Sequence, residues 1–77
     1  MAIVRHLEQQ QLSVEARHSD TDCTYSIVGD SDGKSYLQID TYGSRDRKIP
    51  GKKSQSIRFA PEAIRELRQI LDAHFRS

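Results

Sequence analysis

Residues 30–42, DSDGKSYLQIDTY, decide the fold. The segment opens with Asp30–Gly33, a turn signal, because aspartate side chains bond nearby backbone and glycine adopts positive φ without strain. The residues that follow alternate between two faces. One face carries Leu37, Ile39 and Thr41, and the other carries Tyr36, Gln38, Asp40 and Tyr42. A period of two is typical of a half-buried β-strand, so we expect a strand over residues 34–42.

Three other segments show the same alternation and predict further strands. They are residues 12–17, with Leu12, Val14 and Ala16 on one face; residues 24–29, with Tyr25 and Ile27; and residues 54–59, with Ile57 and Phe59. We therefore expect a four-stranded antiparallel sheet. Residues 1–8 precede it as a flexible or extra N-terminal element.

The C-terminal segment predicts an amphipathic helix. Pro61 suits the first helical turn, and Glu62 suits the positive end of the helix dipole. Apolar residues recur at three- and four-residue spacing and form one stripe: Ile64, Leu67, Ile70, Leu71 and Phe75. The expected fold is α+β, an antiparallel sheet followed by this helix in a single domain over residues 1–77.

The size of the chain favours self-association. Its 77 residues are only 35% hydrophobic, and Cys23 is the single cysteine, so no internal disulfide can form. Domains this small often gain stability from disulfides, metals or oligomerisation. We expect a homodimer that associates through the C-terminal helix. No apolar run reaches the length of a membrane span, and we expect a cytoplasmic protein.

The net charge of +1 conceals an uneven distribution. Residues 1–32 carry two basic and six acidic side chains, whereas residues 33–58 carry seven basic and two acidic ones. A basic block inside a near-neutral protein is typical of a surface that contacts a polyanion. The alternative is a solvated basic loop.

No catalytic or metal-binding pattern is present in the sequence. The potential metal ligands His6, His18, Cys23 and His74 are scattered and do not have the spacing of a zinc site. No nucleophile motif or phosphate-binding loop occurs either. We expect no enzyme activity and no cofactor.

The basic block and the neighbouring strand together form the candidate site. Lysine and arginine attract phosphates, and exposed aromatic rings stack on unpaired bases. This combination favours single-stranded DNA or RNA over duplex. The candidate residues are Lys34, Tyr36, Gln38, Tyr42, Arg45, Arg47, Lys48, Lys52, Lys53 and Arg58. Gln38 is expected to bond a base edge. Alternatively, the tyrosines cap a sheet edge or lie in a dimer interface.

About half of the chain resembles the single-stranded-DNA-binding domain of the Positive Cofactor Four family of transcriptional coactivators. The matching motifs are Gly33-Lys34, Leu37-Gln38-Ile39-Asp40 with Tyr42, Lys48-Ile49-Pro50-Gly51-Lys52-Lys53, Ser56-Ile57-Arg58-Phe59, and the helix from Glu62 onward. The resemblance implies a curved four-stranded sheet, a dimer made by the C-terminal helix, and single-stranded DNA held on the open sheet face. It also implies a role in transcription, replication or repair.

A second hypothesis is a small inhibitor or regulator that binds protein. In that case the basic loop, residues 43–53, would dock on an acidic protein surface, for example one that normally binds nucleic acid.

Overall fold

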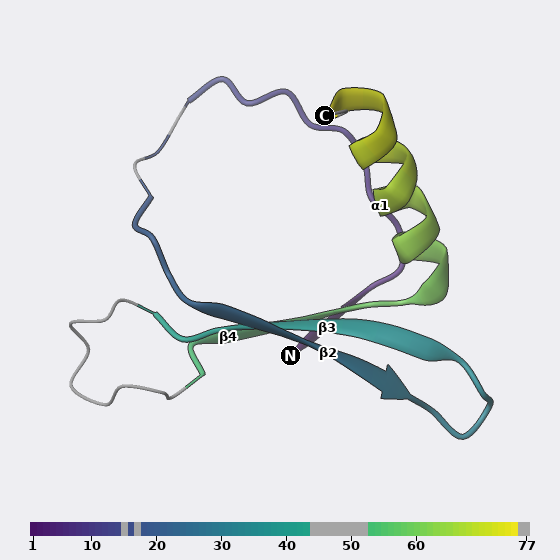
Figure 1. The fold of residues 1–77 in the computed structure, drawn as a ribbon. Coiled ribbons are helices and arrows are strands. Elements are labelled where there is room, and N and C mark those ends of the chain that lie inside the picture. Colours follow the sequence, from purple (N-terminus) through teal and green to yellow (C-terminus); the bar gives the residue numbers. More distant parts are fainter. Residues whose placement is uncertain (15, 17, 44–52, 76–77) are drawn as a thin grey trace.

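The computed structural model describes residues 1–14, 16, 18–43 and 53–75. They form an open, curved sheet and one helix (Figure 1). The elements are β1 (Ala2–Val4), β2 (Cys23–Gly29), β3 (Ser35–Thr41), β4 (Gln55–Phe59) and α1 (Pro61–His74). The strand order is β1-β4-β3-β2, with β2, β3 and β4 antiparallel and β1 parallel to β4. The α+β class, four strands and a C-terminal helix, is confirmed.

Two details of the sequence prediction are wrong. Residues 12–17 contribute no strand among those described, and Leu12 and Val14 are 73% and 80% exposed. The few apolar side chains in this polar segment give too little burial to offset the entropy of ordering it. The fourth strand is instead β1, within the ambiguous N-terminal element. Because β1 runs parallel to β4, the sheet is mixed and not wholly antiparallel.

The turn between β2 and β3 forms as its residues predict. The Asp30 carboxylate accepts hydrogen bonds from the backbone N–H groups of Asp32 and Lys34, at 3.0 and 2.9 Å. Gly33 has a φ of 80°, a left-handed conformation that glycine adopts without strain. These bonds, led by the one from the Lys34 N–H, hold the pKa of Asp30 below its usual value, against the opposing effect of desolvation.

The apolar face of the sheet is built from cross-strand pairs. Leu37 on β3 lies opposite Phe59 on β4, and Ile39 lies opposite Ile57. Ala60 and Ala63 are fully buried where the chain passes from β4 into α1. The core therefore lies at the junction of helix and sheet.

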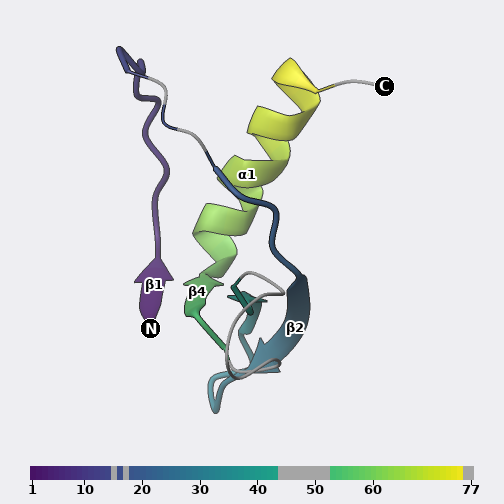
Figure 2. The ribbon, with the colours of Figure 1, turned by 90° about the vertical axis from the view of Figure 1, so that its left-hand side faces the viewer.

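The helix leaves the sheet and does not lie flat across it (Figures 1 and 2). Its first turns are tied to the segment after β1: the Leu7 N–H donates to a Glu66 carboxylate oxygen at 3.0 Å, and Arg5 pairs with Glu62 at 3.4 Å. Its far end is open, with Leu71 and Phe75 exposed by 47% and 70%. The predicted apolar stripe is thus half-buried at Ile64 and Leu67 and exposed from Ile70 onward. None of the helices in the described ranges is long and apolar enough to span a bilayer.

Gly33→Ala should lower the free energy of unfolding by about 1–2 kcal/mol, because alanine is strained at positive φ. Gly29→Ala is the matched control, since its backbone has no positive φ and an added Cβ would meet nothing within 4 Å. Urea unfolding of both variants measures the difference. Equal stability of the two variants would show that the turn does not need its glycine.

Candidate nucleic-acid interface

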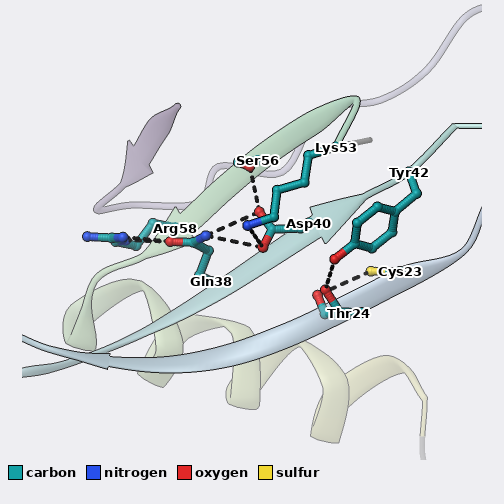
Figure 3. A network of polar contacts seen from close by, with 8 residues as sticks. All are labelled: Cys23, Thr24, Gln38, Asp40, Tyr42, Lys53, Ser56 and Arg58. Carbon is teal, nitrogen blue, oxygen red and sulfur yellow. Dashed lines mark hydrogen bonds and ion pairs between the residues drawn. The ribbon is translucent and has the colours of Figure 1, made fainter. Parts of the chain in front are cut away.

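The second face of the sheet is polar, and the strand register sets its arrangement. Gln38 on β3 lies opposite Arg58 on β4, and Asp40 lies opposite Ser56. Directly opposed residues in an antiparallel pair point to the same side. We call the surface formed by Tyr36, Gln38, Asp40, Tyr42, Lys53, Ser56 and Arg58 the polar face. In Figure 3 the helix lies on the other side of the sheet from the labelled polar-face side chains.

Asp40 is the centre of the polar face (Figure 3). Its side chain is only 2% exposed, and both carboxylate oxygens are hydrogen-bonded. The Ser56 hydroxyl donates to Oδ1, and Gln38 Nε2 lies 3.2 Å from each of the two oxygens. The Lys53 ammonium lies 3.3 Å from Oδ2. A buried carboxylate needs such partners, because an unpaired charge away from water is costly.

The same contacts set the charge state of Asp40. The hydroxyl of Ser56, the amide of Gln38 and the ammonium of Lys53 hold the pKa of Asp40 below its usual value, although desolvation by burial acts in the opposite direction. Asp40 is therefore ionised at neutral pH. It anchors Lys53, whose side chain remains 56% exposed, at the edge of the polar face.

Gln38 connects Asp40 to Arg58. Its amide nitrogen is held by Asp40, so its Oε1 faces β4 and accepts hydrogen bonds from Arg58 Nε and Nη2 at 3.1 and 2.6 Å. A guanidinium presents five N–H donors. Arg58 can thus bind Gln38 through one edge and a phosphate through its remaining donors.

Two tyrosines flank this network at either end of β3. The Tyr42 hydroxyl shares a hydrogen bond of 2.7 Å with Thr24 Oγ1 on β2, and Tyr36 pairs with Val28 of β2 at the other end. Both side chains are half-buried. The hydroxyl of Tyr42 is thus fixed by the protein, which orients its ring.

The structure brings together five of the ten predicted site residues on one face. Tyr36, Gln38, Tyr42, Lys53 and Arg58 share the polar face, and Lys34 lies exposed at the start of β3. Arg45, Arg47, Lys48 and Lys52 lie outside the described residues.

Gln38 occupies a position unlike the one expected for a base-reading side chain. It is 7% exposed, and both ends of its amide are used inside the protein. In this arrangement it links Asp40 to Arg58, and its contact with a base edge stays a prediction. Sequence reasoning did not include Asp40 and Ser56, although strand alternation already placed Asp40 beside Gln38 on this face.

Among residues 1–14, 16, 18–43 and 53–75, no three histidine, cysteine or acidic side chains are grouped so that they could hold a metal ion. Comparison of the chain with family models, with curated proteins and with solved structures finds no match.

Asp40→Asn should lower the melting temperature at about pH 7, and the difference from the parent should shrink below about pH 4. The folded pKa of Asp40 is below its unfolded value of about 3.9, so the ionised carboxylate stabilises the fold above that value. This contribution is lost as the pH falls through the folded pKa. Thermal melts by circular dichroism across this range test it. A difference that is independent of pH would contradict an ionised Asp40.

Proposed function

We propose that the protein is a single-stranded nucleic-acid-binding module that works as a homodimer, in transcription, replication or repair in the cytoplasm. The observation that carries this proposal is the polar face. It presents two cations, Lys53 and Arg58, held in place by the Asp40 network, and two half-buried rings, Tyr36 and Tyr42.

This combination of groups fits an unpaired strand. Cations attract phosphates of any sequence and release counterions on binding. Aromatic rings add stacking with the faces of unpaired bases, which a duplex keeps covered. A sheet offers such groups on one continuous surface, as other single-strand binders do.

The charge distribution adds support for this ligand. Residues 33–58, which contain β3 and all of β4 except Phe59, hold seven of the twelve basic side chains of the protein. Two of them, Lys53 and Arg58, are on the polar face, and Asp40 offsets only one of these charges. The resemblance to the Positive Cofactor Four family leads to the same expectation from the sequence.

The proposed homodimer would use the open end of the helix. Ile70, Leu71 and Phe75 are exposed, and Ile70 and Phe75 line a hollow together with Leu7. Apolar surface of this kind is stabilised when a second apolar surface covers it. Helix α1 of a second copy of the protein has the same apolar stripe and could cover it.

Removal of a cation and removal of a ring should have different effects on binding. Lys53→Ala should weaken binding to all single-stranded sequences and reduce the slope of log affinity against log salt by about 0.7. Tyr36→Ala should leave that slope unchanged and weaken binding by about 1–3 kcal/mol. Titration of labelled single-stranded and duplex oligonucleotides at about 50 and 200 mM salt measures both effects.

Two conservative variants serve as controls for this titration. Lys53→Arg keeps the charge, and Tyr36→Phe keeps the ring and removes only the hydroxyl. Both should bind almost as the parent does. If the parent bound no oligonucleotide at low salt, the proposal would fail. A basic surface that docks on an acidic protein would then explain the charge distribution better.

Leu71→Glu should break the contact between helices of the homodimer, because it places a charge in the apolar stripe of the helix. Gln69→Glu adds the same charge at another exposed helix position and should leave the dimer intact. Analytical ultracentrifugation should give a lower mass for Leu71→Glu than for this control. Unchanged association of Leu71→Glu would place the dimer interface away from the helix.

A further inference from the structure

The outer edge of β2 is an open strand edge with none of the features that commonly protect one. The sheet order leaves β2 with β3 as its only partner among the described strands. Soluble proteins usually protect such edges by charged side chains, proline, bulges or short strands. The other edge strand, β1, is only three residues long, but β2 has seven, CTYSIVG, with no charge and no proline.

The hydrogen bonds at the two ends of β2 show which backbone groups face outward. The Tyr42 N–H donates to the Asp22 carbonyl at 3.1 Å, and the Asp30 N–H donates to the Lys34 carbonyl at 3.0 Å. Hydrogen-bonded pairs alternate along an antiparallel ladder. The even-numbered residues between Asp22 and Asp30 therefore bond β3. The odd-numbered residues, Cys23, Tyr25, Ile27 and Gly29, direct their N–H and C=O groups to the open edge.

The side chains of these outward-bonding residues lie on the apolar face. Tyr25 pairs with Ile39 and Ile27 pairs with Leu37 across the β2–β3 ladder, so they share that face. Tyr25 and Ile27 are nevertheless 74% and 69% exposed. Within the described part of the chain, the open edge thus combines backbone groups that have no partner strand with an adjoining apolar strip.

We propose that the β2 edge pairs antiparallel with β2 of a second copy of this chain, with a twofold axis at Ser26. This register is self-complementary: Cys23 faces the second copy's Gly29, and Tyr25 faces the second copy's Ile27. Both members of each pair have outward N–H and C=O groups, so the full length of the strand is bonded. An aromatic residue opposite a β-branched residue is a favourable cross-strand pair.

This pairing has a consequence for the polar face that rests on the proposed function. Odd-numbered residues meet odd-numbered residues, so the apolar faces of the two copies adjoin and the polar faces form one continuous surface. The β2 edge is separate from α1, which contacts β3 and β4. One chain can use both surfaces, and a single strand could then cross from one copy to the next.

Disulfide trapping tests the register. In the proposed pairing, the Cα atoms of Cys23 and of residue 29 in the second copy are about 5.5 Å apart, within the range of a disulfide. Gly29→Cys fits the fold, because an added Cβ meets nothing within 4 Å. Mild oxidation of this variant should give a covalent dimer on a non-reducing gel.

Two control variants separate this result from random collision of thiols. The double variant Cys23→Ser, Gly29→Cys keeps the introduced thiol without its partner and should stay monomeric on the gel. Ile27→Cys pairs with Cys23 only in a shifted register and should crosslink far less. Equal crosslinking of all three variants, or none of Gly29→Cys, would overturn the proposal.

A backbone variant tests the same contact in solution. Ile27→Pro removes an outward N–H without touching the β3 ladder, whereas Ile27→Thr removes the apolar side chain but keeps the N–H. If the edge pairs, Ile27→Pro should lower the mass seen by ultracentrifugation relative to Ile27→Thr, with circular dichroism unchanged. Equal masses for these two folded variants would overturn the proposal. Neither assay contains nucleic acid, so a negative result here leaves the proposed function untouched.

Discussion

The polar face depends on one buried carboxylate. Asp40 lies near the C-terminal end of β3, and only 2% of its surface is exposed. Its charge is tolerated because three groups converge on it: the Gln38 amide from β3, the Ser56 hydroxyl from β4, and the ammonium of Lys53, just before β4. Those three partners are thereby fixed in place. Through Gln38 the same carboxylate also orients the guanidinium of Arg58.

The two faces of the sheet have different roles in this account. One face is apolar and pairs Leu37 with Phe59 and Ile39 with Ile57. The other face carries cations and aromatic rings in place of apolar side chains, so it adds little to the apolar core. A small domain with one face used in this way has a thin core, which is consistent with the exposed apolar surface on β2 and at the end of α1. Self-association at both places would restore burial that a single chain lacks.

The sequence predicted the elements that have strong local signals. β3 follows an Asp-Gly turn and alternates over its whole length, and α1 has a proline start and a regular apolar stripe. The sequence did not show that β1 is a strand, because three residues are too few to reveal a period of two. Its partner β4 also lies more than fifty positions away in the chain. Residues 12–17 alternate equally well, but alternation alone does not provide a partner strand. In the site, shared-face placement of Gln38 and Asp40 followed from alternation. The bonds from Ser56, Lys53 and Arg58 depend on the β3–β4 register, which local patterns do not determine.

The central claim is that the polar face binds a single strand, and side-chain NMR during titration with a short oligonucleotide tests it most directly. The account predicts that the ring signals of Tyr36 and Tyr42 and the Nε signal of Arg58 shift with the oligonucleotide concentration. The ring of Tyr25 and the methyl groups of Ile39 and Ile57, on the apolar face, should move little. Shifts confined to the apolar face, or no shifts at low salt, would contradict the account.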